Sequence, residues 1–229
     1  MNDALRTAFS YSLLPVAALV FAGMLTAAWP VGRIWVSRFQ HFASGVIISS
    51  VALELLPVSL KSGSMIGLLL GYAGGVAAML AIDQYGENAS TKVPIATDLF
   101  IDGLLLMIGF AAGKSGGMLL LLGLTLETTA LGMAIGPVLA AEGPTRMRAI
   151  FPLTGLALSI LAGAACGLFL PRQTGLWFAA ILGFGIAALL FLVIEELITE
   201  AHEIPDTPFT TSLFFVGFLI PLLLAQVNS

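Results

Sequence analysis

Apolar runs of about twenty residues or more repeat along nearly the whole chain, and this feature most restricts its fold. A helix needs roughly 20 apolar residues to cross the hydrocarbon core of a bilayer. Eight runs reach this length, at residues 9–29, 34–60, 63–82, 95–113, 117–141, 148–170, 174–200 and 208–227. Because backbone polar groups in lipid must bond within their own segment, we expect an all-α integral membrane protein with eight transmembrane helices.

The segments between these runs are short and contain residues that typically end helices. They are Pro30 to Arg33, Lys61 with Ser62 and Gly63, DQYGENASTK at 83–92, Lys114 to Gly117, EGPTRMR at 142–148, Pro171 with Arg172, and HEIPDTP at 202–208. Only 10% of the 229 residues are charged, compared with about 25% in soluble domains. We therefore expect residues 1–229 to form one transmembrane domain, in which the first run is a retained span and not a signal peptide.

Composition and motifs exclude several other classes of protein. Cys166 is the only cysteine, so the chain has neither a disulfide framework nor a thiolate zinc cluster. A net charge of −4 argues against a nucleic-acid partner. The sequence has no Ser/His nucleophile pair, no His-Glu-x-x-His motif and no phosphate-binding glycine loop, so we do not expect an enzyme.

Basic residues at the ends of the runs and between them indicate an orientation. An even number of spans places both termini on one side of the membrane. The basic residues expected on that side are Arg6, Lys61, Lys114 and Arg172, and those on the other are Arg33, Arg38, Lys92, Arg146 and Arg148. Because cytoplasmic loops are enriched in Lys and Arg, this small excess favours the second side as cytoplasmic.

Two of the runs share a sequence pattern. FASGVIISSVALELLP at 42–57 and LGFGIAALLFLVIEELIT at 182–199 each begin with small residues, continue with apolar ones and end with a Glu-Leu pair. The two runs cross the membrane in opposite directions, so they would belong to inverted repeats. Inverted repeats are common in transporters, whose substrate sites lie at the repeat interface.

Acidic residues within the apolar runs are the strongest functional signal. They are Glu54, Asp98, Asp102, Glu127, Glu195, Glu196 and Glu200, and no Lys or Arg lies well inside any run. A carboxylate at the centre of a bilayer costs about 2.5–3.5 kcal/mol on insertion scales. These side chains should therefore face the interior of the helix bundle, where protons or bound cations offset their charge.

Helical spacing brings some of these acids together. Asp98 and Asp102 are four residues apart and share one helix face, as do Glu196 and Glu200. Glu127 lies near the middle of its run, and its neighbours Thr125, Thr128 and Thr129 offer either oxygen ligands or hydrogen bonds to the backbone. Glycines that would let the fourth and fifth spans approach closely are Gly103, Gly109, Gly132 and Gly136. Convergent carboxylate oxygens suit hard or borderline divalent cations.

Simpler structural roles exist for several of these residues. Asp98 is a candidate N-cap, because Asp is favoured at that position, whereas Asp102 is a full turn too deep for this role. His41 and His202 lie at the edges of runs and are expected to be interfacial rather than metal ligands. The acids near the ends of their runs could simply reach interfacial water, and these are Glu54, Glu196 and Glu200.

Four runs resemble motifs of the ZIP family of divalent metal transporters, and the resemblance extends from about residue 35 to the end of the chain. HFASGVIISSVALELLP is similar to the second span of the family, with Glu54 in the place of its histidine. DLFIDGLLLMIG is similar to the fourth-span motif His-Asn-Phe-x-Asp/Glu-Gly, with Asp98 in the histidine place and Asp102 matching. LETTALGMAIGPV resembles the fifth-span motif, with Glu127 at or beside its histidine. FGIAALLFLVIEELITEAHE is close to the seventh-span pattern ending in Glu-Glu-Leu-x-x-Glu.

The resemblance implies eight helices in a 3+2+3 arrangement, with spans 1–3 and 6–8 as inverted repeats and spans 4 and 5 between them. It also implies a metal site on spans 4 and 5, a possible homodimer, termini outside and the loop at 83–94 inside. This orientation agrees with the distribution of basic residues, and we expect a bacterial inner-membrane location. Glu54 on one membrane face, and Glu195, Glu196 and Glu200 on the other, would mark the two vestibules.

The chain departs from the family pattern where metal is bound. Both motif histidines are replaced, the prolines that kink spans 4 and 5 are absent, and Leu158 stands near the place of the sixth-span glutamate. The remaining ligands, Asp98, Asp102 and Glu127, would form one all-carboxylate site. The expected substrate is a divalent metal ion, Mn²⁺, Fe²⁺, Mg²⁺ or Zn²⁺, with zinc bound more weakly than in a nitrogen-rich site.

Two other functions stay open at this point. The same buried acids can serve as proton relays in a carrier coupled to protons or monovalent cations. A chain that has lost the motif histidines can also be a non-transporting membrane partner that senses metal. Steeply pH-dependent, metal-independent transport would indicate the first alternative, and metal binding without uptake would indicate the second.

Overall fold

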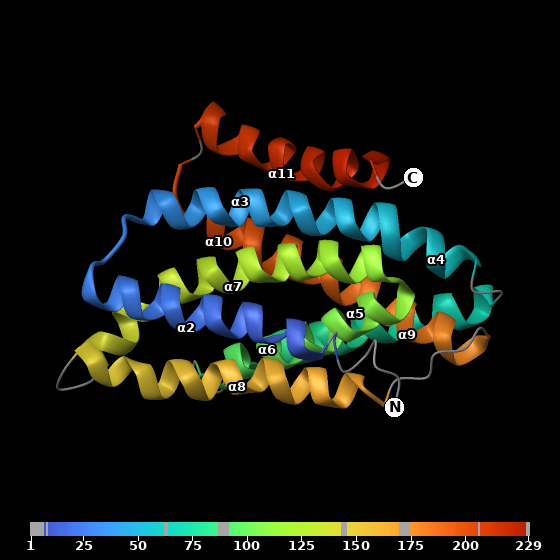
Figure 1. Cartoon of the computed structure of the whole chain (residues 1–229), viewed down its shortest axis with the longest axis horizontal. Coiled ribbons are helices and arrows are strands. Elements are labelled where there is room, and N and C mark those ends of the chain that lie inside the picture. Colours follow the sequence, from blue (N-terminus) through green and yellow to red (C-terminus); the bar gives the residue numbers. More distant parts are fainter. Residues whose placement is uncertain are drawn as a thin grey trace.

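The computed structural model is built of helices joined by short segments, with no strand among the residues it describes. These residues are 7, 9–61, 64–86, 92–142, 146–169, 175–205 and 207–227. The α-helices, labelled as in Figure 1, are α2 (Leu13–Ala28), α3 (Arg33–Ser50), α4 (Leu56–Lys61), α5 (Met65–Gly86), α6 (Lys92–Ala112), α7 (Lys114–Glu142), α8 (Ile150–Gly167), α9 (Leu176–Phe191), α10 (Thr199–Ala201) and α11 (Pro208–Val227). Two π-helical segments, η1 (Val51–Leu55) and η3 (Leu192–Ile198), continue α3 and α9, and a 3₁₀ turn, η2 (Arg146–Ala149), precedes α8. The expected all-α fold is confirmed.

Seven described helical segments are long and apolar enough to cross a membrane. They are Phe9–Ala28, Arg33–Lys61, Met65–Gln84, Ile95–Ala112, Lys114–Ala141, Ile150–Gly167 and Leu176–Ala201, and an eighth apolar helix at Pro208–Leu224 is slightly shorter. These segments coincide with the eight predicted runs. Their length and composition are those expected of an integral membrane protein.

The long helices run roughly along the long axis of the molecule, so the chain crosses the bundle repeatedly (Figure 1). We call its two ends the Arg33 end, where α3 begins, and the Lys61 end, where α4 finishes. The helix α2 begins, and α11 finishes, at the Lys61 end. The helix α11 packs mainly on α3 at the edge of the bundle, whereas the span formed by α9, η3 and α10 is the most buried. The central helices therefore carry side chains that are shielded from the surroundings.

Four glycines of α6 and α7 contact different neighbours. Gly103 faces the backbone of Ile160 in α8, and a Cβ added there would collide with the Ile160 carbonyl oxygen. Gly132 and Gly136 face the backbone of α2. Of the four, Gly109 alone lies at the contact between α6 and α7. The expectation that all four bring the fourth and fifth spans together is therefore wrong for three of them. Gly103 instead allows close packing of α6 on α8, and Gly132 and Gly136 allow close packing of α7 on α2.

The two π-helical segments occupy matching places in the shared sequence pattern. η1 contains the pair Glu54-Leu55, and η3 contains the pair Glu196-Leu197. Such segments are rare in proteins and often lie at functional sites, because they change the face on which the following side chains emerge. The sequence resemblance between the two runs is thus accompanied by the same local backbone irregularity.

Most described helix boundaries agree with the predicted breaks. The segments around Pro30 and at 202–205 lie between helices as expected. The predicted break at 114–117 is wrong, because α7 begins at Lys114 and only Gly113 separates it from α6. Backbone hydrogen bonds from Gly113 N to Gly109 O and from Gly117 N to Gly113 O link the two helices across this residue. Four predicted breaks, at 61–63, 83–92, 142–148 and 171–172, lie wholly or partly outside the described residues. Of their described parts, 61, 83–86, 92 and 142 are helical and belong to α4, α5, α6 and α7, and 146–148 belong to η2.

Candidate cation site

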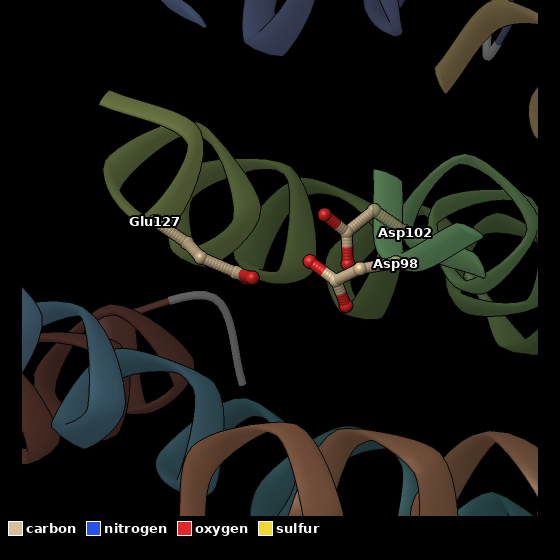
Figure 2. Close-up of side chains that lie close together, drawn as sticks. All are labelled: Asp98, Asp102 and Glu127. Carbon is tan, nitrogen blue, oxygen red and sulfur yellow. The ribbon is translucent and has the colours of Figure 1, made fainter. Parts of the chain in front are cut away.

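Three predicted ligands converge inside the bundle. One carboxylate oxygen from each of Asp98, Asp102 and Glu127 lies within 4.8 Å of the other two. Figure 2 shows the two aspartates extending from α6 and Glu127 extending toward them from α7. Asp102 is ten residues into α6 and Glu127 thirteen residues into α7, which is roughly 15 Å and 20 Å along the helix axes. The three acids therefore meet near the middle depth of the bundle.

The helix α6 places both aspartates on the face toward α7. They are one turn apart, so their side chains emerge on the same side. Leu99, on a neighbouring face of the helix, and Leu105, about one turn beyond Asp102, are fully or almost fully buried in the apolar core. The alternative role of Asp98 as an N-cap is wrong, because α6 begins six residues earlier, at Lys92. Asp98 thus lies within α6, beyond the first turn where a side chain can cap the helix.

The carboxyl groups of Asp98, Asp102 and Glu127, which we call the carboxyl cluster, are buried, and several of their oxygens lack a hydrogen-bond partner. Asp102 is 2% exposed and Glu127 is 4% exposed. Within the described part of the chain, both oxygens of Asp102, Oδ1 of Asp98 and Oε2 of Glu127 lack a hydrogen-bond partner. The ion pair found among the described residues joins Arg33 to Glu203 at the surface, far along the chain from these acids. Burying a carboxylate without a partner costs several kcal/mol, so these oxygens require a proton or a cation.

Glu196 of η3 extends the cluster. Its carboxyl group shares a hydrogen bond with that of Asp98, although the sequence resemblance assigns Glu196 to a vestibule. One turn further along, Glu200 accepts a hydrogen bond from Gln40 Nε2 at 2.6 Å. Glu200 also interacts electrostatically with Asp98 and Glu127. The acids therefore form a continuous series from the centre of the bundle toward the Arg33 end.

Gln40 is a polar residue of this series that the sequence analysis missed. It lies on α3 and is only 3% exposed. The available signal was an amide side chain inside a predicted span, where a buried polar group needs a partner. Since Gln40 holds Glu200, it positions the outermost acid of the series.

A cavity of about 400 Å³ opens at the Arg33 end of the bundle. Glu200 and Gln40 contribute to its wall, and Ala134 and Pro137 of α7 form part of the opposite side. Glu196 lies one helical turn deeper than Glu200, about 5–6 Å along the axis. The cavity thus leads from this end of the molecule toward the carboxyl cluster.

Two of the predicted vestibule acids, Glu54 and Glu195, lie outside the cluster. Glu54 accepts a hydrogen bond from Ser115 Oγ at 2.7 Å, which links η1 to the first turn of α7. Glu195 is exposed on η3. Neither residue belongs to the group of convergent carboxylates among the described residues. Of the predicted vestibule acids, Glu196 joins the cluster, Glu200 lines the cavity, and the other two do neither.

The threonines beside Glu127 serve the backbone. Thr125 Oγ1 donates a hydrogen bond to Leu121 O at 2.5 Å. Thr128 and Thr129 donate to Thr125 O at 3.1 Å and 2.6 Å. Of the two roles that the sequence left open for these hydroxyl groups, the structure therefore supports backbone hydrogen bonding within α7.

His41 and His202 lie beside each other, with ring centroids 5.3 Å apart. Nδ1 of each ring lies within hydrogen-bonding distance of a carbonyl oxygen one turn earlier, Ser37 O for His41 and Ile198 O for His202. His41 is 3% exposed, so the expectation that it is interfacial is wrong, whereas His202 is exposed. Neither imidazole belongs to the convergent group of described ligands, which consists of carboxylates.

The cluster has the chemistry of a site for a hard cation. Its ligands are oxygens, which Mg²⁺, Ca²⁺ and Mn²⁺ prefer. Carboxyl groups from two different helices meet there, so a bound ion would join α6 to α7. No protein-family model and no curated protein sequence matches the chain. The function must therefore be argued from the site itself.

Proposed function

We propose that this protein is a membrane carrier of divalent metal cations, with Asp98, Asp102 and Glu127 as its substrate site. The observation that supports this most strongly is the convergence of three buried carboxyl groups with unpaired oxygens in the middle of a helical bundle. A divalent cation offsets charges that no described basic side chain offsets. The sequence resemblance of these helices to the ZIP family supports the same function.

The composition of the site favours Mn²⁺, Fe²⁺ or Mg²⁺ over Zn²⁺ as substrate. Nitrogen and sulfur ligands favour zinc, and the convergent group holds neither among the described residues. Carboxylate oxygens favour harder ions. Glu196, hydrogen-bonded to Asp98, is available as a further oxygen ligand when the ion binds.

The scaffold of the carrier is a 3+2+3 arrangement of spans with inverted repeats. The main helix contacts support this, because α2 packs on α7 as α8 packs on α6, and α5 packs on α9 as α11 packs on α3. If the first three spans are exchanged with the last three, and the fourth with the fifth, the contact of α2 with α7 becomes that of α8 with α6. The contact of α5 with α9 likewise becomes that of α11 with α3. The two π-helical segments fit the same exchange. The substrate site then lies between the repeats, as in many transporters.

The route of the ion runs from the cluster to the cavity at the Arg33 end. Glu196 and Glu200 provide successive carboxylates along this route, and Gln40 holds the second of them. At the Lys61 end, the hydrogen bond between Ser115 and Glu54 joins α7 to η1. Alternating access would require this contact to open while the cavity at the Arg33 end closes.

One observation favours proton coupling as a second candidate function. The carboxyl groups of Asp98 and Glu196 lie beside each other in a largely buried setting, where two acids are stable together only if one of them carries a proton or a cation binds between them. A carrier that exchanges protons for another substrate could use the same pair. In that case transport would depend steeply on pH and would not depend on metal.

Uptake into proteoliposomes tests the proposed function. We expect the purified protein to accumulate Mn²⁺, Fe²⁺ or Mg²⁺ from a panel that includes Zn²⁺. Asp102→Asn and Glu127→Gln should reduce the initial rate by about tenfold or more, because each removes a charged ligand. Glu195→Gln is the matched control, since it alters an exposed acid outside the cluster and should leave the rate within about twofold of wild type.

Three results would contradict the proposal. Equal uptake by the wild type and both cluster variants would exclude the three acids as the substrate site. Metal binding without any uptake would instead indicate a metal-sensing membrane partner. Uptake of a different substrate that depends on pH but not on metal would favour the proton-coupled carrier.

A further inference from the structure

Arg38 lies between two aromatic rings near the Arg33 end of α3. Its guanidinium carbon is 4.8 Å from the centroid of the Trp35 ring and 5.1 Å from that of Phe209, the second residue of α11. Cation–π contacts of this kind hold a guanidinium group in place without neutralising its charge. The arrangement fixes a positive charge where α3 meets α11.

This positive charge lacks an acidic partner in the part of the chain that the structure describes. The ion pair at this end uses Arg33 and Glu203, and Glu200 accepts from Gln40. Nε of Arg38 is buried without a hydrogen-bond partner. The ring of Phe209 belongs to the first turn of α11, where the helix dipole adds partial positive charge. An anion at this position would therefore satisfy both the guanidinium group and the helix end.

The two rings face outward at the level of lipid headgroups. Trp35 is 53% exposed and Phe209 is 59% exposed. The segment Arg33–Lys61 has 29 residues, about 43 Å of helix, which exceeds the hydrocarbon thickness of about 30 Å. Arg38 lies five residues from its start, about 8 Å along the axis, and thus close to the boundary between headgroups and hydrocarbon. Exposed aromatic residues at this depth are typical of membrane–water interfaces.

We propose that Arg38, Trp35 and Phe209 form a binding site for the phosphate of an anionic phospholipid. The guanidinium fork matches a phosphate geometrically and in charge. The exposed rings contact the glycerol and upper acyl region of the same lipid, which a free phosphate ion does not provide. A lipid bound here lies across the contact between α3 and α11. The site is independent of the carboxyl cluster.

Trp35 allows a direct test by fluorescence quenching. The protein is prepared with Trp29→Phe and Trp177→Phe, so that Trp35 is the only tryptophan, and is reconstituted with phosphatidylglycerol or phosphatidylcholine brominated in the upper acyl chain. We expect half-maximal quenching at about a tenfold lower mole fraction of the brominated phosphatidylglycerol, because both lipids carry a phosphate but the cationic choline of phosphatidylcholine repels the guanidinium group. Arg38→Gln should abolish the preference. Arg148→Gln changes an exposed arginine elsewhere in the chain and should retain the preference.

Three results would overturn this site. They are an unchanged lipid preference in Arg38→Gln, the absence of a preference in the parent protein, and release of the quenching by millimolar inorganic phosphate, which would indicate a site for free anions. If Arg38→Gln does not fold, Arg38→Lys decides the question. A preference reduced by about threefold or more supports the site, because lysine cannot form the fork. An unchanged preference contradicts it.

Discussion

Asp102→Asn is expected to lower the affinity for Mn²⁺ by about 100-fold or more. Asp102 is 2% exposed, and both of its oxygens lack a hydrogen-bond partner within the described chain. Asparagine keeps the size of the side chain and one oxygen, but it removes a full negative charge from the ligand set. Ligand charge is a main determinant of the affinity of oxygen sites for divalent ions. Calorimetric titration of purified protein with Mn²⁺ measures the change.

Two further variants test whether the loss of affinity is specific to the cluster: Glu195→Gln is the control and Asp98→Asn removes a second ligand. Glu195 is an exposed acid on η3, so its replacement should leave the affinity within about twofold. Asp98 contributes its own carboxylate oxygen to the convergent group, so Asp98→Asn should weaken binding as Asp102→Asn does. If Mn²⁺ bound equally well to the wild type and to both aspartate variants, the ion would have to bind elsewhere.

The same Asp102→Asn variant is expected to be more stable than the wild type when no divalent cation is present. Without an ion, Asp98, Asp102 and Glu127 are buried close together and no described basic side chain compensates them. Replacing buried charged groups with neutral ones of similar size often stabilises a protein by about 1–4 kcal/mol. For a chain of this length, 1 kcal/mol corresponds to a shift of roughly 2–4 °C in the unfolding midpoint. Thermal unfolding in detergent with a chelator measures this shift.

Adding Mn²⁺ should reverse the order of stability. A ligand stabilises the folded protein by an amount that grows with the logarithm of its concentration relative to the dissociation constant, about 2.7 kcal/mol at a ratio of 100. The wild type should gain this stability and the variant should not. Glu54→Gln is the control for a general effect of removing acids, because Glu54 already has Ser115 as a partner. If Asp102→Asn were less stable than the wild type when no cation is present, Asp102 would have a structural role.

The helices themselves are largely predictable from the sequence. Hydropathy is a local property, and runs of about twenty apolar residues can satisfy their backbone in lipid only as helices. Helical periodicity likewise predicts that Asp98 and Asp102 share a face. Local signals are less reliable at helix ends. The cluster of Lys, Ser and Gly at 114–117 indicates a break, yet backbone hydrogen bonds across Gly113 make it the first turn of α7.

The composition of the site is less predictable, because it depends on contacts between distant segments. The meeting of Glu127 with the two aspartates was expected from the family resemblance and not from spacing alone. Glu196 was assigned to a vestibule, because its place near the end of a run does not reveal the direction of its side chain in a π-helical segment. Gly132 and Gly136 show the same limit, since a small residue permits close packing but does not specify which helix approaches.

The location of a bound ion tests the central claim most directly. Crystals of the protein soaked with Mn²⁺ and measured near the manganese absorption edge reveal the ion by its anomalous scattering. We expect one strong peak bounded by carboxylate oxygens of Asp98, Asp102 and Glu127, which should vanish in Asp102→Asn. A peak beside His41 and His202 with none between α6 and α7, or no peak in a soaked crystal of the wild type, would contradict the proposed substrate site.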